Sequence, residues 1–333
     1  MRSDCDGNAV PSPMIDAMHI VIAHCDAGAG VAWQSALARH LPQARITLDV
    51  GTPDGAGSAP GAAADYAVGW KPPADFFERH GSLQAFFSCG AGVDHLLRHP
   101  GLPGTLPLYR LEDAGMGTLM ADYCLHQLLR IAGRHDDYAR QQVEGRWLEL
   151  DPLAREDMPV GILGLGVLGE AVARRLADNG FIVRAHARSP RTLPGIEVSH
   201  GAAALNGFLA ATRVLILLLP LTLETTDLID AQALAALQPG AFLINIARGA
   251  LVVDADLLAA LDRGQLAGAT LDVFRHEPLP ATHPFWHHPR VRITPHVSGP
   301  TQVGASAEQV AGKLALLARS GTPSGLVHRD RGY

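Results

Sequence analysis

Short apolar runs alternate with longer stretches of mixed polarity along the first hundred residues of the chain. Apolar runs of this length are typical of buried strands, and the polarity of residues 31–40 indicates a helix. The strands predicted in this part of the chain are 18–24, 46–50, 66–70 and 83–88. Strands that alternate with helical segments favour a parallel sheet. Residues 51–64 are rich in glycine, alanine, proline and serine, so we predict a flexible loop there.

A second series with the same alternation begins near Met158. Before it, residues 121–134 have the pattern of a long helix and residues 136–150 are more polar. The second series predicts strands at 159–163, 181–185, 214–219, 241–246, 268–273 and 291–294, and helices at 170–178, 231–236 and 254–263. A last helix is predicted at 305–318 and is expected to fold back onto the first series. The chain is therefore expected to form two α/β domains, each a doubly wound parallel sheet.

Composition narrows the classes of protein to which the chain can belong. At 333 residues it suits two domains rather than one core. A net charge of −6 and the lack of a basic tract argue against nucleic-acid binding. The longest apolar stretch, 214–221, is too short for a membrane span. Residues 1–17 lack the apolar core of a signal peptide, so we expect a cytoplasmic protein.

Cysteines and histidines give no sign of a disulfide framework or a metal site. The four cysteines have no paired spacing, which favours reduced thiols. The sixteen histidines contain no ligand pattern such as HExxH, so no metal is expected.

A glycine-rich turn stands at the start of the second series. Gly164, Gly166 and Gly169 have the spacing GxGxxG, directly after a predicted strand and before a predicted helix. In that context the glycines allow a tight turn and a close approach of the backbone to a pyrophosphate, which the amino end of the helix attracts. A plain strand-to-helix turn is the alternative. The context favours a dinucleotide site.

The end of the next predicted strand bears on which dinucleotide binds. In NAD-binding proteins an acidic residue at the end of this strand binds the ribose. In this chain Ala187 occupies that position, and no carboxylate is nearby. Arg188, Ser189 and Arg191 follow, and guanidinium and hydroxyl groups suit a 2′-phosphate. We therefore predict NADPH, with NADH as a weaker alternative. Solvated loop charges are the other interpretation of these arginines.

Three polar residues follow predicted strands in the last part of the second series. Arg248 lies in INIARGALVV, Glu277 in LDVFRHEPLP together with Asp272, and His296 in ITPHVSG. Ligands bind beyond the carboxyl ends of strands in open parallel sheets, so these positions suit a reaction site. Each residue alone has an ordinary alternative as a surface arginine, a loop acid or a histidine in a turn.

The glycine-rich turn, ARG, LDVFxxEPLP and TPH, in this order and spacing, resemble the D-isomer-specific 2-hydroxyacid dehydrogenases. The resemblance covers nearly the whole chain after Met18. Four further segments resemble the glyoxylate/hydroxypyruvate reductase A subfamily more closely: GAGVDHLL at 90–97, LYRLEDAGMG at 108–117, WHHPRVRITPHV at 286–297 and the terminal RDRGY.

The resemblance implies a fold and a set of catalytic roles. A Rossmann NAD(P)-binding domain at 119–297 is expected to be inserted into a flavodoxin-like substrate domain made of 1–118 and 298–333. Arg248 would bind the substrate carboxylate and polarise the keto oxygen. His296 would protonate that oxygen, because imidazole titrates near neutral pH, and Glu277 would orient the imidazole. The cofactor would carry the hydride.

The resemblance also implies binding roles for other positions. Trp70 would line the substrate pocket, and the backbone of Ala91 and Gly92 would hold the substrate carboxylate; a core tryptophan and a plain tight turn are the alternatives. Asp272 would contact the nicotinamide amide or, alternatively, cap a loop. The remaining cofactor contacts would come from Val167, Leu168, Leu219, Pro220, Thr225 and Ala247.

The expected activity is NADPH-dependent reduction of glyoxylate or hydroxypyruvate to the 2-hydroxy acid. A reductase of a bulkier keto acid such as phenylpyruvate is one alternative, and a dinucleotide-sensing corepressor-like protein is another. Lys71 replaces a histidine of similar proteins, and the 51–64 loop is long, which leaves the substrate range open. The family is usually dimeric, so we expect a homodimer through the segment after Tyr123, where Tyr138 and Trp147 lie.

Overall fold

A computed structural model describes residues 18–50 and 63–333 of the chain. The predicted loop at 51–64 lies almost wholly outside the described residues. The chain divides into two compact units. One runs to Ala114 and resumes at Thr301, and the other spans Gly115–Pro300. Each is a parallel-sheet α/β unit, so the predicted fold class is confirmed.

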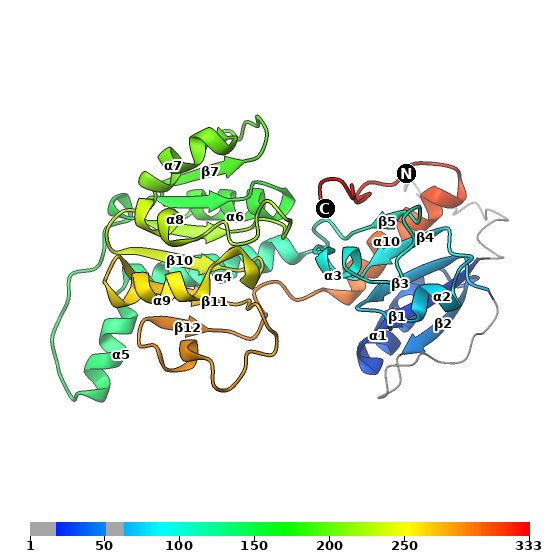
Figure 1. The fold of residues 1–333 in the computed structure, drawn as a ribbon, viewed down its shortest axis with the longest axis horizontal. Helices are drawn as coiled ribbons and strands as arrows, with labels where there is room; N and C mark the ends of the chain where they lie inside the picture. Colours follow the sequence, from blue (N-terminus) through cyan, green and yellow to red (C-terminus); the bar gives the residue numbers. More distant parts are fainter. Residues whose placement is uncertain (1–17, 51–62) are drawn as a thin grey trace, which may run out of the picture. The chain divides into compact units, whose positions relative to one another are not determined.

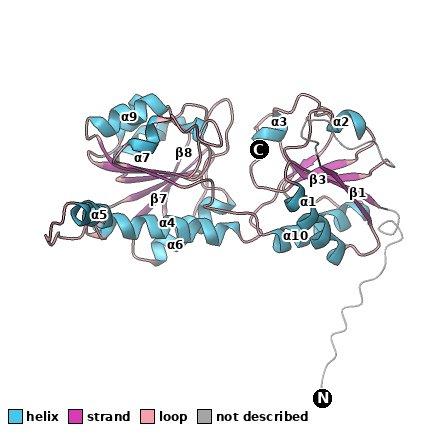
Figure 2. Ribbon diagram, turned by 90° about the horizontal axis from the view of Figure 1, so that it is seen from below, coloured by secondary structure: helices cyan, strands magenta, loops and turns pink. Residues whose placement is uncertain are grey.

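The first unit contains a five-stranded parallel sheet in the order β2-β1-β3-β4-β5. Its strands are β1 (His19–His24), β2 (Arg45–Val50), β3 (Tyr66–Trp70), β4 (Ala85–Ser88) and β5 (Leu108–Tyr109). One face carries α1 (Ala27–His40) and α10 (Val303–Ala318), which pack together, and the other carries the short α2 (Phe76–Arg79) and α3 (Asp94–Leu97), as Figure 2 shows. The last helix therefore returns to the first series, as predicted.

The second unit contains a seven-stranded parallel sheet in the order β12-β11-β10-β9-β6-β7-β8 (Figure 1). The strands are β6 (Val160–Leu163), β7 (Val183–Ala187), β8 (Glu197–His200), β9 (Val214–Leu217), β10 (Ala241–Asn245), β11 (Leu266–Leu271) and β12 (Val291–Ile293). The helices are α4 (Met116–Ala132), α5 (His135–Val143), α6 (Val167–Asp178), α7 (Ala202–Ala210), α8 (Ala231–Ala236) and α9 (Asp254–Asp262). The strand order reverses between β6 and β9, and ligands bind at such a switch point in this class of fold.

Both faces of the second sheet are buried. Val160, Ile162 and Ile216 pack with α4 and α6 on one face. Leu163, Leu217 and other residues of the same strands pack with α8 and α9 on the opposite face. Alternate side chains of a strand point to opposite faces, so strands covered on both sides become continuously apolar. This explains why the sequence pattern locates the central strands.

The predicted elements differ from the observed ones at their ends, and α2, α3, α7 and β5 were not predicted. β7 and β11 are each offset by two residues from the predicted strands, and α4 begins five residues earlier. Edge strand β8 was not predicted because its side chains are partly exposed and its sequence, EVSH, is not apolar. Helix α5 begins at His135, one residue before the polar stretch at 136–150, and ends within it. Among the described residues, none of the helices is both long and apolar enough to cross a membrane.

Candidate functional site

Three adjacent strands of the second sheet end beside the predicted site residues. β10, β11 and β12 are neighbours and run parallel. Arg248 follows the end of β10, Asp272 directly follows β11, and His296 follows β12. The carboxyl ends of parallel strands share one edge of the sheet, so three segments distant in sequence meet there.

His296 and Glu277 form a hydrogen-bonded pair. The imidazole Nδ1 lies 2.9 Å from Oε2 of Glu277, and the side chains are 44% and 31% exposed. The other carboxylate oxygen, Oε1, accepts a 3.0 Å hydrogen bond from the backbone N–H of Phe274. Partial burial would raise the pKa of Glu277, but hydrogen bonds from His296 and Phe274 and the charges of His296 and Arg248 lower it below its ordinary value.

The pair fixes which nitrogen of the imidazole can serve a substrate. An ionised Glu277 can only accept hydrogen bonds, so Nδ1 of His296 carries the donated proton. Nε2 is then the nitrogen left for proton exchange with another molecule. A carboxylate that holds a histidine in one tautomer and orientation is also the arrangement of the serine-protease triad. The geometry therefore suits general acid–base catalysis.

Arg248 is held in a turn that a buried asparagine shapes. The side-chain amide of Asn245 donates to the carbonyl of Arg248 at 2.9 Å, and its oxygen accepts from the N–H of Ala247 at 3.1 Å. A Cβ on Gly249 would lie 2.0 Å from the carbonyl carbon of Phe274, so only glycine allows this turn to approach the loop that carries Glu277. The sequence analysis missed Asn245, although a polar residue inside an apolar strand is a visible signal.

Asp272 is fully buried, and its carboxylate is bound to the loop that carries His296. Oδ1 accepts from the hydroxyl of Thr294 at 2.5 Å and from the N–H of Val297 at 2.9 Å, and Oδ2 accepts from the N–H of Ser298 at 2.9 Å. The N–H of His296 donates to the Asp272 carbonyl at 2.8 Å. His296 has a left-handed backbone, with φ of 56°, which this network maintains. The loop-capping interpretation of Asp272 thus has direct geometric support.

A tyrosine of α4 extends this network. Burial raises the pKa of Tyr123 to about 12, so its hydroxyl stays protonated at neutral pH. The hydroxyl lies 2.7 Å from Oγ1 of Thr294, which itself donates to Asp272. Tyr123 must therefore donate, and the three groups form a directed chain of hydrogen bonds. Neither Tyr123 nor Thr294 was predicted as part of the site.

The glycine-rich turn has the geometry that the motif requires. Gly164 has a φ of 109°, and a Cβ there would lie 2.6 Å from the carbonyl carbon of Leu218. A Cβ on Gly169 would lie 2.1 Å from the carbonyl oxygen of Gly164. A Cβ on Gly166 would meet nothing within 4 Å, and α6 begins at the next residue, Val167. Val167 and Leu168 therefore lie in the first helical turn, whose N–H groups lack acceptors within the helix.

The segment after β7 carries positive charge without a carboxylate at the strand end. β7 ends at Ala187, the position where the sequence analysis expected an acid in an NAD-binding protein. Arg188 and Ser189 are exposed on the following loop. The Arg191 guanidinium instead binds the carbonyl of Leu165 and the carboxylate of Glu170, so it lies against the glycine-rich turn. These residues can hold an anion beside the turn.

The other predicted cofactor contacts lie in ordered turns. The Thr225 hydroxyl donates to the Pro220 carbonyl at 2.7 Å and accepts from the N–H of Thr222 at 2.8 Å, which closes the turn after Leu219. Ala247 is buried, and its carbonyl accepts from Arg248 at 2.7 Å.

The predicted substrate residues Trp70, Ala91 and Gly92 belong to the first unit, whereas the catalytic candidates belong to the second. Trp70 ends β3, and its ring lies 4.0 Å from that of His95 between centroids. A Cβ on Gly90 would lie 2.5 Å from the Trp70 ring, so the glycine lets the indole pack on the backbone of this turn. Ala91 and Gly92 follow directly and are half-buried.

Comparison with known proteins identifies the family. The model of the NAD binding domain of D-isomer specific 2-hydroxyacid dehydrogenases matches residues 125–298. The chain belongs to this family. It is 44% identical over 306 residues to a glyoxylate/hydroxypyruvate reductase A from Serratia proteamaculans, with 90% of this chain and 96% of that protein covered. The predicted family is thereby confirmed.

Solved structures give the same result. A D-isomer specific 2-hydroxyacid dehydrogenase from Xanthobacter autotrophicus Py2, in complex with NADPH and MES, is 38% identical with a TM-score of 0.88, and the match covers 95% of this chain and 99% of that one. An NADPH-dependent glyoxylate/hydroxypyruvate reductase from Sinorhizobium meliloti, in complex with NADP and sulfate, is 35% identical with a TM-score of 0.88, and covers 95% and 100%.

Replacing Thr294 with valine tests the network around Asp272. Thr294→Val keeps the side-chain shape but removes one donor from a buried carboxylate and the acceptor of Tyr123. Unsatisfied buried polar groups cost about 1–3 kcal/mol, so the free energy of unfolding in urea should fall by that amount. The exposed Thr226, replaced by valine as a control, should change it by less than about 0.5 kcal/mol. Equal losses in both variants would contradict the network.

The lowered pKa of Glu277 predicts a pH-dependent stability. A carboxylate with a folded pKa below its ordinary 4.5 contributes stability that is present above that value and is lost as the pH falls through the folded pKa. The difference in Tm between wild type and Glu277→Gln should therefore be larger at about pH 5, where the carboxylate is ionised and the imidazole can carry its charge, and should shrink below about pH 4. A difference that does not change with pH would show that the ionised carboxylate has no stabilising partner.

Proposed function

We propose that this chain reduces glyoxylate and hydroxypyruvate to the corresponding 2-hydroxy acids with NADPH. The observation that carries the proposal is the His296–Glu277 pair at the carboxyl edge of the sheet, with the positive charge of Arg248 close enough to lower the pKa of Glu277. The named relatives support the substrates, because they are glyoxylate/hydroxypyruvate reductases.

The residues present fit an NADPH molecule. The crowded Gly164 and Gly169 and the open face at Gly166 suit a pyrophosphate at the start of α6. The position of Ala187 offers no carboxylate to repel a 2′-phosphate, and Arg188 and Ser189 can bind one. Three solved relatives are complexes with NADPH or NADP. We assign the remaining cofactor contacts to Val167, Leu168, Arg191, Leu219, Pro220, Thr225 and Ala247.

The chemistry follows from the properties of the side chains. When bound, NADPH supplies the hydride that reduces the keto carbon. Arg248 binds the carboxylate of the keto acid and draws electron density towards the keto oxygen. His296 donates the proton on Nε2 to that oxygen, and Glu277 keeps the imidazole oriented and stabilises its charged form. In the reverse direction the neutral imidazole takes the proton back.

Substrate binding is assigned to the first part of the chain. We infer that residues 1–118 and 298–333 form the substrate domain and that residues 119–297 form the cofactor domain. The backbone N–H groups of Ala91 and Gly92 hold the substrate carboxylate, and Trp70 borders the space for the substrate. The packing of Trp70 on Gly90 supports this, because it places a rigid ring beside that turn.

Initial rates at 340 nm test the proposal, with four keto acids each combined with NADPH and with NADH. Rapid NADPH oxidation with glyoxylate and hydroxypyruvate, faster than with pyruvate or phenylpyruvate, is expected. Activity with phenylpyruvate alone would agree with the proposed mechanism but contradict glyoxylate and hydroxypyruvate as the substrates. If folded protein binds NADPH but turns over none of the keto acids, the result would contradict the proposed enzymatic activity and favour a dinucleotide sensor.

Substitution of Arg188 tests the cofactor preference. Removal of the guanidinium in Arg188→Ala should raise the KM for NADPH about tenfold or more and leave that for NADH nearly unchanged, because only NADPH carries the 2′-phosphate. Arg184→Ala is a matched control, because Arg184 lies on β7 and pairs with the exposed Glu197, and it should leave both KM values unchanged. An equal rise of KM for both cofactors would contradict the assignment of Arg188.

We also propose a homodimer that forms through the segment after Tyr123. Exposed apolar side chains gather there: Val143 is 90% exposed and Trp147 is fully exposed. The hydroxyl of Tyr138 binds both the N–H and the carbonyl of Leu150, which keeps the segment folded back on α5. Sedimentation should give twice 35.2 kDa for wild type and a shift towards the monomer for Trp147→Ala. A wild-type monomer at micromolar concentration would contradict the proposal.

A further inference from the structure

A cavity in the Gly115–Pro300 unit lies apart from the residues assigned to catalysis, the cofactor and the substrate, and its α4 and α5 wall belongs to the segment proposed above for the dimer. Its volume is about 470 Å³, and it is lined by α4, α5, strands β10 to β12 and Arg213, which directly precedes β9. It borders Phe242 and Ala267, each the second residue of its strand, and Arg290, which precedes β12. These are the amino-terminal parts of the strands whose carboxyl ends carry Arg248, Asp272 and His296. The same sheet therefore has a second candidate site away from that edge.

The charge of this cavity contrasts with that of the whole protein. Its titratable lining residues are six arginines and two aspartates, an excess of four positive charges, whereas the chain has a net charge of −6. The arginines are Arg130, Arg134, Arg140, Arg213, Arg290 and Arg292. Like charges in a partly buried space repel one another, so this lining favours an anion.

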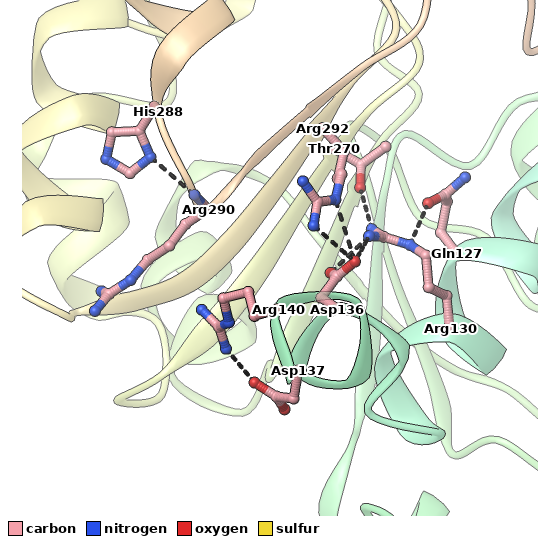
Figure 3. A network of polar contacts seen from close by, with 9 residues as sticks. All are labelled: Gln127, Arg130, Asp136, Asp137, Arg140, Thr270, His288, Arg290 and Arg292. Atoms are coloured by element: carbon pink, nitrogen blue, oxygen red, sulfur yellow. Dashed lines mark hydrogen bonds and ion pairs between the residues drawn. The ribbon is translucent and has the colours of Figure 1, made fainter. Parts of the chain in front are cut away.

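Each aspartate is already shared between two arginines. Figure 3 shows Arg130 from α4 and Arg292 from β12 converging on Asp136. The contacts are 2.5 Å and 3.0 Å to Oδ1, and Arg130 also donates to the hydroxyl of Thr270 at 3.1 Å. One carboxylate between two guanidinium groups leaves one positive charge uncompensated.

Asp137, the second aspartate of the cavity, is also shared between two arginines. Arg134 and Arg140 both bind Asp137, the first at 2.5 Å, and Figure 3 shows Arg140 against it. Partial burial alone would raise the pKa of Asp137, but the hydrogen bonds and charges of the two arginines lower it below its ordinary value. The local potential is therefore positive even where a carboxylate is present.

The remaining two arginines have no carboxylate partner among the described residues. Arg290 donates from its guanidinium to the carbonyl of Leu261 at 2.7 Å, which leaves its other nitrogens for another acceptor. Arg213 precedes β9, and its guanidinium lies beside Gly240, 3.3 Å from where a Cβ would stand. These two groups, from different segments, supply donors that no carboxylate of the described residues occupies.

We propose that this cavity is a binding site for a small, multiply charged oxyanion, either a phosphate ester or a polycarboxylate. The planar guanidinium presents paired donors that match the oxygens of phosphate and carboxylate groups. The volume lies within the range of small-molecule sites. The site is separate from the proposed reductase site, so it would serve regulation or stability rather than the hydride transfer.

Calorimetric titration of the full chain tests the proposal, with pyrophosphate and citrate as probes and saturating NADP+ to fill the cofactor site. Wild type should bind at least one probe, more weakly as the salt concentration rises. Arg213→Gln and Arg290→Gln should each weaken that binding about tenfold or more. Arg184→Gln removes an equal charge from β7, outside the cavity, and should not change it. A preference for pyrophosphate would indicate a phosphate ester, and one for citrate a polycarboxylate.

Two results would overturn the proposal, and sedimentation would then show what the cavity is. Wild type that binds neither probe excludes an oxyanion site of this kind. Equal weakening in Arg184→Gln would show that the binding depends only on the overall charge. If no probe binds and Arg213→Gln changes the sedimentation of the protein, the cavity is a contact between chains. Keto-acid reduction by the variants at the wild-type rate without any added anion confirms that they are folded.

Discussion

The buried carboxylate of Asp272 is the constraint on which the candidate site depends. A fully buried charge is costly unless hydrogen bonds compensate for its lost solvation, and here all three of its donors come from residues 294–298. The carboxylate is satisfied only if that loop wraps around it. The left-handed backbone of His296 and the direction of its imidazole towards Glu277 follow from this requirement. The Asp272 carboxylate does not touch the imidazole of His296, yet it determines where that imidazole lies.

The parallel sheet brings the other catalytic candidates to the same edge as His296. Because β10, β11 and β12 are neighbours, the turn with Arg248, the loop with Glu277 and the loop with His296 begin at one edge. Gly249 allows the first turn to touch the second loop at Phe274. The resulting charges are complementary: Arg248 and His296 keep Glu277 ionised, and Glu277 orients His296. Positive charge for a carboxylate and a positioned proton donor for a keto oxygen are what 2-keto acid reduction requires.

Sequence patterns located the central strands and the glycine-rich turn because both have local signatures. Gly164 and Gly169 are crowded by nearby backbone, and the strands are apolar because both faces are buried. The edge strand β8 and the offset of β11 could not be predicted from apolar runs, since exposure and pairing decide them. Thr294, which donates to Asp272, and Tyr123, which donates to Thr294, were missed for a related reason. Tyr123 and Thr294 are 171 residues apart and meet only in the folded protein.

The proton transfer from His296 is the central claim, and single-turnover oxidation of NADPH with hydroxypyruvate by His296→Asn tests it most directly. Asparagine can still bind Glu277 but cannot donate a proton as an acid, so the rate should fall by about 10²–10⁴-fold while the Kd for NADPH stays near that of wild type. A variant that reduces hydroxypyruvate at the wild-type rate would show that another group supplies the proton.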